Sequence, residues 1–210
     1  MNPQRGNNNG QAQLEEPPLF FYMPNGPHGE LCQWHPCQFT ITKAEINALI
    51  GHPDDAETTE GDKSESITFS CAEQFMMYCK AGRFHDTKTQ TKVMATDDPN
   101  IQKRLGKGVI GFSDSSWDMV KSEVVIAGNM AKFGQNPKLK RKLMATGNRL
   151  LVEAASRDRV WGIGYSEKHA MSHRQHWGEN RLGKALMIVR ERLRGSTVAD
   201  GQEPGDQTLE

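Results

Sequence analysis

Apolar residues recur at helical spacing in three parts of the chain. In residues 116–131 and 182–193 they follow one another at intervals of three and four, which is typical of a helix with one buried face. Residues 70–81 are apolar on almost every side, so we expect that helix to be buried nearly all round. The positions that carry the first two patterns are Trp117, Val120, Val124, Ala127, Ala131, Leu182, Leu186, Val189 and Leu193.

Residues with known end preferences mark where these helices begin and stop. Ser70 is a natural N-cap for the helix over residues 70–81, and Glu73, three residues later, completes a capping box. Gly82 is suited to close that helix. Pro137 breaks the preceding helix and can begin another one that runs through Met144.

Short strands are expected at residues 20–23, 67–69 and 149–154, between segments rich in turn residues. Residues 52–66 are polar and predict a loop, and residues 161–164 predict a strand end or a tight loop. No internal repeat is visible. The pattern predicts a mainly α fold of the α+β class, a compact helical domain with a few short strands.

The two ends of the chain differ in composition from the middle. Mean hydropathy is −0.69, and residues 1–18 and 195–210 hold few apolar side chains. Such segments bury too little apolar area to offset their ordering entropy, so we expect both ends to be disordered. The sequence therefore predicts one domain over residues 19–194.

Charge and cysteine content narrow the class of protein. The chain has 26 basic and 26 acidic residues, so no overall charge draws it to nucleic acid or to a membrane. No signal peptide and no membrane-spanning run is visible. We expect a cytoplasmic or nuclear monomer without membrane contact. Without a secretory context, free thiols are expected at all four cysteines: Cys32, Cys37, Cys71 and Cys79.

Glu73 and Lys80 are the first candidates for chemistry. They lie seven residues apart, which is two helical turns, so they share one face. Two opposite charges on one helix face usually indicate that this face is exposed to solvent. The apolar residues around them instead indicate a desolvated lysine, whose lowered pKa makes the neutral amine available as a nucleophile.

For two further segments, the sequence is compatible with either a ligand-binding role or a structural role. The glycines of Trp161-Gly162-Ile163-Gly164 would let a backbone approach a phosphate or a sugar, or they would serve a tight turn. Asn180 would cap the last helix, or the free N–H groups at that helix start would bind an anion.

Metal sites, cofactor motifs and hydrolase triads find no support. His169, His173 and His176 match no standard zinc spacing, and neither do Cys32 and Cys37, so we expect no metal and no cofactor. The histidine segment is expected to be a polar loop that touches substrate phosphates. The basic run at 138–142 is expected to be a solvated helix surface, and no Gly-x-Ser-x-Gly elbow is present.

Several segments, taken in order, resemble the NADAR family, whose members include bacterial N-glycosidases. The matching pieces are Leu31-Cys32-Gln33-Trp34, Ala72-Glu73-Gln74-Phe75-Met76-Met77-Tyr78-Cys79-Lys80, Leu105-Gly106-Lys107, Trp117 with Val120 and Lys121, Ala131-Lys132-Phe133-Gly134-Gln135-Asn136, Ala145-Thr146-Gly147-Asn148, Leu151-Val152-Glu153-Ala154, Asp158 with Trp161-Gly162-Ile163-Gly164, and Gly178-Glu179-Asn180-Arg181-Leu182-Gly183-Lys184. Cys32, Lys107 and Ala155-Ser156 depart from the common residues at the expected cleft wall, where they affect substrate choice more than chemistry.

The resemblance implies a largely helical fold and a ligand that contains ribose and phosphate. It implies an N-glycosidase that removes ADP-ribose from guanine in nucleic acid or a nucleoside, with ADP-ribose as the product. A hydrolase of ribosylamino pyrimidine phosphates from riboflavin synthesis and a non-catalytic ADP-ribose-binding module stay open as alternatives.

Residue roles follow from the reaction and the resemblance together. Lys80 is the expected nucleophile that forms a Schiff base, Glu73 and Asp158 are candidate acid and base, and Glu123 is a third carboxylate. Trp117 or Trp161 would stack on a base or ribose. The expected ligand-binding residues are Gln33, Trp34, Trp117, Trp161, Gly162, Ile163, Gly164, Asn180, Gly183 and Lys184.

Overall fold

The computed structural model describes residues 16–52 and 65–199. Most of the predicted terminal disorder, and most of the polar loop expected over residues 52–66, lies outside these described residues. The last helix continues through Ala199, five residues into the segment that the sequence predicted as a tail.

The described residues are mainly helical with four short strands, as predicted. The helices are α1 (Lys43–Ile50), α3 (Ala72–Arg83), α4 (Thr87–Met94), α5 (Pro99–Lys107), α6 (Asp114–Asp118), α7 (Lys121–Gly134), α8 (Pro137–Met144), α9 (Glu167–Ala170) and α10 (Arg181–Ala199), with 3-10 turns η1 (Gly29–Leu31) and η2 (Met171–His176). The strands are β1 (Leu19–Phe21), β2 (Phe39–Thr42), β3 (Ser66–Phe69) and β4 (Leu151–Glu153).

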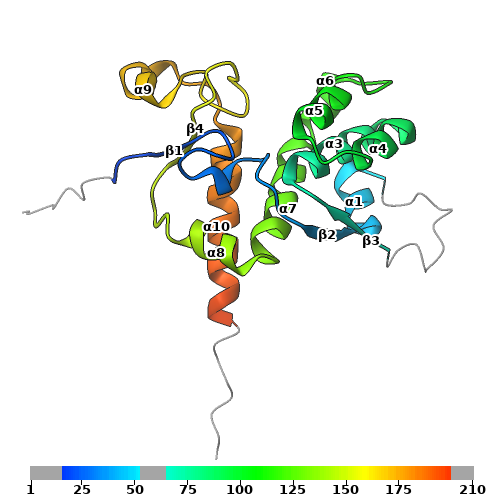
Figure 1. The fold of residues 1–210 in the computed structure, drawn as a ribbon, viewed down its shortest axis with the longest axis horizontal. Helices are drawn as coiled ribbons and strands as arrows, with labels where there is room; N and C mark the ends of the chain where they lie inside the picture. Colours follow the sequence, from blue (N-terminus) through cyan, green and yellow to red (C-terminus); the bar gives the residue numbers. More distant parts are fainter. Residues whose placement is uncertain (1–15, 53–64, 200–210) are drawn as a thin grey trace, which may run out of the picture.

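The strands form two separate pairs. β1 and β4 run parallel, with Leu19 opposite Leu151 and Phe21 opposite Glu153. β2 and β3 run antiparallel. Figure 1 shows the β1–β4 pair beside α10 and the β2–β3 pair on the other side of the molecule, near α1 and α3. The pair that ends at Glu153 is the one that reaches the candidate site.

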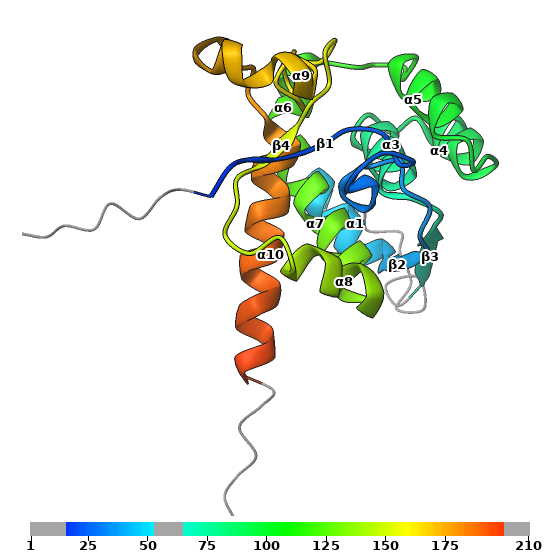
Figure 2. The same cartoon turned by 60° about the vertical axis from the view of Figure 1, so that its left-hand side comes forward.

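Helix α7 joins the two sides. It packs against α10 on one side and α3 on the other, and α3 in turn contacts α4 and α5. Figure 2 shows α10 running past β4 and extending well below the other helices. The core contains fully buried side chains from these helices, including Phe75 on α3, Phe133 on α7 and Leu186 on α10. Within the described residues, no helix is long and apolar enough to span a membrane.

The start of α3 differs from the predicted capping box. The N-cap is Cys71, whose Sγ accepts a hydrogen bond from the Gln74 backbone N–H at 3.5 Å. Ser70 instead donates its own N–H and hydroxyl to Gln74 Oε1, at 2.7 and 3.1 Å. Because the N-cap is one residue later than predicted, Gln74 rather than Glu73 makes the side-chain contact to the residue at the helix start. The Glu73 carboxyl is therefore not used in a capping box.

The helical pattern that begins near Ser116 belongs to two helices rather than one. The Ser113 hydroxyl caps α6 by accepting from the Ser116 N–H at 3.3 Å, and the chain turns at Met119 and Val120 before α7 begins. Apolar spacing continues across this turn because both helices pack on the same core. The sequence patterns also gave no helix for α1, α4 or α5.

Candidate active site

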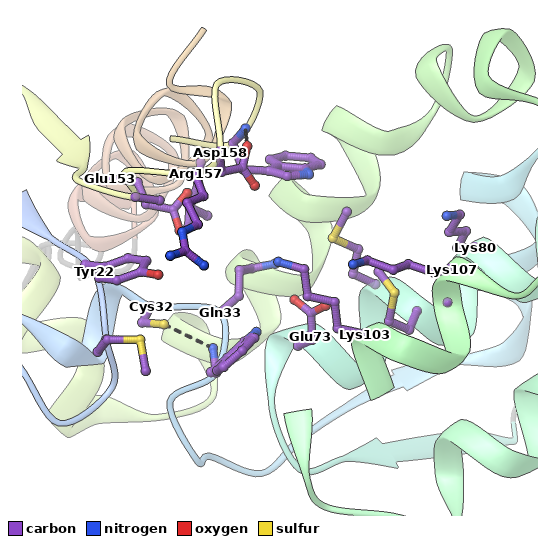
Figure 3. Close-up of a pocket in the computed structure, with 18 of the residues that line it drawn as sticks. Tyr22, Cys32, Gln33, Glu73, Lys80, Lys103, Lys107, Glu153, Arg157 and Asp158 are labelled. Atoms are coloured by element: carbon purple, nitrogen blue, oxygen red, sulfur yellow. Dashed lines mark hydrogen bonds between the residues drawn. The ribbon is translucent and has the colours of Figure 1, made fainter. Parts of the chain in front are cut away.

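One cavity of about 300 Å³ is lined by three of the four predicted catalytic residues and by four of the predicted ligand-binding residues. Its walls come from the β1–β4 side of the molecule and from α3, α5 and α6. Figure 3 shows Glu153, Arg157 and Asp158 on one side, with Lys80 and Lys107 on the other. The lining residues that the sequence predicted are Gln33, Trp34, Glu73, Lys80, Trp117, Asp158 and Trp161. The cavity is also lined by residues that the sequence did not predict, among them Tyr22, Lys103, Lys107, Glu153 and Arg157.

Glu73 lies in the first turn of α3 and its side chain is buried, with 6% of the residue exposed. Burial raises the pKa of its carboxyl from 4.5 to about 7, and the nearby Asp158 adds to this rise. Lys103 and Lys80 act in the opposite direction but do not cancel the effect of burial. Glu73 is therefore able to hold or release a proton near neutral pH.

Lys80 lies two turns further along the same helix and is half-buried at the cavity wall. Its ammonium nitrogen lies 4.0 Å from the centroid of the Phe112 ring. Burial lowers the pKa of this lysine, while the charges of Asp114 and Glu73 act against that change. The amine is thus partly desolvated, and Lys80 lines the same cavity as Glu73, as the nucleophile hypothesis requires.

Asp158 shapes the loop that carries Trp161. Its Oδ1 accepts hydrogen bonds from the backbone N–H groups of Val160 and Trp161, at 2.9 and 2.8 Å. This arrangement fixes the carboxylate at the cavity wall. It also brings a negative charge close enough to Glu73 and Glu153 to raise the pKa of both.

Glu153 is a cavity residue for which the sequence analysis predicted no role. It ends β4, and burial raises the pKa of its carboxyl from 4.5 to about 8, with smaller contributions from Asp158 and Glu73. Its Oε2 atom is buried and has no hydrogen-bond partner among the described residues. An acid that ends a strand of apolar residues was the available signal in the sequence.

Aromatic side chains and cations complete the cavity. Trp117 is buried at the wall, and the Lys103 ammonium lies 5.7 Å from the ring centroid of Trp34. Trp161 and the exposed Tyr22 also line the space. Flat aromatic faces beside lysine and arginine are well suited to hold a base, a ribose and a phosphate.

Comparison with known proteins decides the family. The NADAR domain family matches residues 20–194, which is most of the chain and nearly the whole predicted domain. The chain belongs to the NADAR family.

Relatives of this NADAR chain include proteins named as enzymes. An N-glycosidase of Acanthamoeba polyphaga mimivirus is 40% identical over 129 residues, covering 60% of this chain and 76% of the viral protein. The N-glycosidase YbiA of Escherichia coli is 33% identical over 116 residues, covering 55% of this chain and 67% of YbiA. A riboflavin biosynthesis protein of Vibrio vulnificus is 28% identical over 183 residues, covering 87% of this chain but 40% of that protein.

The fold is also that of a solved NADAR protein. The NMR structure of Escherichia coli YbiA superposes with a TM-score of 0.63, at 23% identity, over 90% of this chain and 92% of the other. The expected family and the mainly helical fold are both confirmed.

Several predicted ligand-binding residues of the NADAR chain lie beside the cavity rather than on its wall. A Cβ on Gly162 would come within 2.8 Å of the Glu153 carbonyl oxygen, and one on Gly183 would overlap the Leu151 carbonyl oxygen. Ile163 is fully buried in a small cluster with Val152 and Ala170. Both glycines therefore allow close packing around β4.

Gly164 and Asn180 hold left-handed backbone conformations, with φ of 77° and 52°. The Asn180 side chain is buried and binds β4 instead of capping α10: its Oδ1 accepts from the Glu153 N–H at 3.0 Å, and its Nδ2 donates to the Leu151 carbonyl at 2.9 Å. Asn180 thus acts on the cavity through Glu153.

Glu123 and Lys184 are exposed and are not among the described residues that line the cavity. Glu123 lies in the first turn of α7. Lys184 lies near the start of α10, on the face opposite the buried Leu182 and Leu186.

The four cysteines are free thiols, as predicted.

Proposed function

We propose that this NADAR protein is an N-glycosidase and that ADP-ribosylated guanine is its substrate. One observation carries the proposal: two carboxyl groups with a pKa near neutrality, Glu73 and Glu153, line a single cavity with the half-buried amine of Lys80. An acid that still holds its proton near pH 7 suits the protonation of a departing base.

The reaction breaks the bond between the anomeric carbon and a base nitrogen. A cavity carboxyl group protonates the base as it leaves, and the neutral amine of Lys80 attacks the anomeric carbon. Opening of the sugar ring converts this adduct to a Schiff base, and water then releases the free sugar. The partly desolvated position of Lys80 favours the neutral amine that the attack needs.

The cations of the cavity support a phosphate-bearing sugar. Lys103, Lys107 and Arg157 lie on its walls among the carboxyl groups. Arginine and lysine bind phosphate by charge-assisted hydrogen bonds, and arginine does so in a bidentate way. A diphosphate beside the ribose would reach these side chains while the base stacks on Trp34, Trp117 or Trp161.

A partly exposed segment after Asp158 supports a guanine carried in a nucleic acid. The rings of Tyr165 and His173 stack at 4.6 Å, and the Arg159 guanidinium lies 5.9 Å from the Tyr165 centroid. Aromatic rings interleaved with cations are typical of surfaces that hold single strands. Arg157, two residues before Arg159 in the chain, lines the cavity.

Hydrolysis of ribosylamino pyrimidine phosphates is the second candidate. Its support is the riboflavin biosynthesis protein of Vibrio vulnificus, whose similarity extends over 87% of this chain. The same acid, amine and cations serve that reaction, because it also releases an amine from the anomeric carbon of a phosphorylated ribose.

Base release from the two substrates tests the proposal. Purified protein is incubated with ADP-ribosylated guanosine and, separately, with the ribosylamino pyrimidine phosphate, and the products are separated by chromatography. We expect guanosine and ADP-ribose from the first, no turnover by Lys80→Ala, and normal turnover by the exposed control Lys88→Ala. Turnover of the pyrimidine substrate alone would favour the second candidate. Tight ADP-ribose binding by calorimetry without turnover of either would favour a binding module.

A further inference from the structure

We infer that Glu153 is the acid that protonates the departing base and that Asn180 is the residue that positions it. This inference rests on the proposed N-glycosidase function. The sequence analysis named Glu73 and Asp158 as candidates for the acid and the base. The inference instead assigns the role of the acid to Glu153, for which the sequence predicted no role.

The backbone around Glu153 is fixed from three sides. Phe21 on β1 pairs with Glu153, and the next N–H, that of Ala154, donates to the Phe21 carbonyl at 2.8 Å. The Glu153 carbonyl accepts from the Ile163 N–H at 3.0 Å, and its own N–H donates to Asn180 Oδ1. These contacts hold the backbone of Glu153 in place, and its side chain lines the cavity.

The carboxyl group itself is left without a partner. Oε2 is buried and makes no hydrogen bond within the described residues, although buried polar atoms nearly always have one. Leaving such an atom unpaired destabilises the protein. A ligand in the cavity can supply the hydrogen bond that Oε2 does not make within the protein. A neutral carboxyl group there offers an O–H donor to a base nitrogen.

Glu73 and Glu153 face different neighbours. Lys103 and Lys80 both favour the charged form of Glu73, whereas Lys103 alone of these two acts on Glu153. Burial disfavours a charge on Glu153 most strongly, and Asp158 and Glu73 add to that effect. Of the two groups, Glu153 is thus the one that keeps its proton to higher pH, while Glu73 loses its proton at lower pH.

The two sides of the cavity match the geometry of a displacement. Figure 3 shows Glu153 beside Arg157 and Asp158, across the cavity from Lys80. A nucleophile must approach the anomeric carbon from the face opposite the leaving group. With Lys80 on one wall, the departing base and its proton donor belong on the other wall, where Glu153 lies.

The proton balance closes over one turnover. As the carbon–nitrogen bond breaks, its electron pair passes to the base nitrogen, which takes the proton of Glu153 and leaves as a neutral base. Lys80 holds the sugar carbon. Water then adds to that carbon and releases Lys80, and the proton that water loses returns to the Glu153 carboxylate.

A leaving group that needs no proton isolates this step. Wild type, Glu153→Gln and the exposed control Glu191→Gln are assayed on ADP-ribosylated guanosine and on the same compound methylated at guanine N7, whose base is already cationic. General acids contribute roughly 10²–10⁴-fold, so we expect Glu153→Gln to lose about 100-fold or more on the first compound and less than about 5-fold on the second. The control should match wild type on both.

Each other outcome has a definite meaning. Equal losses of Glu153→Gln on both compounds, or full activity on both, would overturn the role of Glu153 while the N-glycosidase function stands. Cleavage of neither compound by wild type would overturn the proposed substrate, and this inference with it. Circular dichroism of Glu153→Gln confirms that the variant is folded before its rates are compared.

Discussion

The side chain of Asn180 holds both ends of the short strand that carries Glu153. Its Oδ1 accepts from the Glu153 N–H at 3.0 Å, and its Nδ2 donates to the Leu151 carbonyl at 2.9 Å. Asn180 takes the left-handed conformation, with φ of 52°, which asparagine tolerates better than most residues. One amide at the start of α10 thereby fixes the strand end from which an acidic side chain enters the cavity.

Replacing Asn180 with Ala should lower activity as well as stability. Both hydrogen bonds to β4 are lost and a φ of 52° is strained for alanine, so we expect a loss of about 1–3 kcal/mol of unfolding free energy. We also expect kcat to fall about tenfold or more with a smaller change in KM, because the acid is displaced. Thermal melts and steady-state kinetics measure both.

Asn136→Ala is the matched control. Its Nδ2 donates to the carbonyls of Gln38 and Lys132, at 3.0 and 2.8 Å, and Asn136 does not line the cavity. We expect a similar loss of stability with kcat unchanged. Equal falls in kcat for both variants would show that Asn180 acts only through general stability.

The pH dependence of activity should form a narrow bell. Glu73, with a pKa of about 7, acts best when it has lost its proton, and Glu153, with a pKa of about 8, acts only while it holds one. We therefore expect kcat/KM on ADP-ribosylated guanosine to rise toward pH 7 and to fall above pH 8. In Glu153→Gln the residual activity should lack the alkaline fall; a fall that persists would assign it to another group.

Stability should decrease as pH rises through the range in which Glu153 titrates. Its pKa is about 8 in the folded protein and near 4.5 in the unfolded chain. Between these values the unfolded chain loses the proton and the folded protein keeps it, so the unfolded state is favoured as pH rises. Below pH 4 the effect is absent.

Glu153→Gln removes the part of this dependence that comes from Glu153, whereas the part that comes from Glu73 stays. We expect the variant and wild type to melt alike near pH 4, and the variant to be more stable by about 3–5 kcal/mol at pH 9, since the pKa of Glu153 rises from 4.5 to about 8 on folding and one pKa unit corresponds to about 1.4 kcal/mol. Melts across this pH range provide the measurement. A variant that is less stable than wild type at pH 9 would contradict the burial of an unpaired carboxyl group.

Gly162→Ala should destabilise the fold rather than weaken ligand binding alone. A Cβ there would lie 2.8 Å from the Glu153 carbonyl oxygen and 2.9 Å from the Ala155 Cβ, which is too close for both. Overpacking of this kind costs about 1–3 kcal/mol. Thermal unfolding is the readout.

Gly195→Ala is the control variant, because it adds a Cβ at a glycine that has open space around it. It lies in α10, and an added Cβ there meets nothing within 4 Å. Replacing an open helical glycine with alanine should stabilise the protein by about 0.5–1 kcal/mol. If Gly162→Ala is instead as stable as wild type and merely loses activity, the backbone-to-ligand role predicted from the sequence would be favoured.

The sequence predicted those parts of the fold that depend on local apolar spacing. The helices around Val124 and Leu186 have strong periodic patterns, the helix around Phe75 is apolar on almost every side, and all three form. Helices α1, α4 and α5 are short, and α4 and α5 are dominated by polar residues. Their position is set by packing against α3. That is tertiary information, which local spacing does not contain.

The candidate site was predicted where a residue had an unusual setting on its own helix. Glu73 and Lys80 stood out because a nearly apolar helix carries them. Glu153 and Asn180 act through contacts between residues 27 positions apart in the chain, and no local pattern encodes that pairing. The same long-range contacts explain why Gly162 and Gly183 serve packing around β4 and do not line the cavity.

The central claim is that the amine of Lys80 takes up the sugar carbon. Sodium borohydride added during turnover of ADP-ribosylated guanosine reduces a Schiff base to a stable adduct, which peptide mass spectrometry locates. We expect the ADP-ribose adduct on Lys80 of the wild type, and no adduct on Lys80→Arg, which keeps the charge without a nucleophilic amine. Turnover by the wild type without any adduct, or an adduct on a different lysine, would contradict the claim.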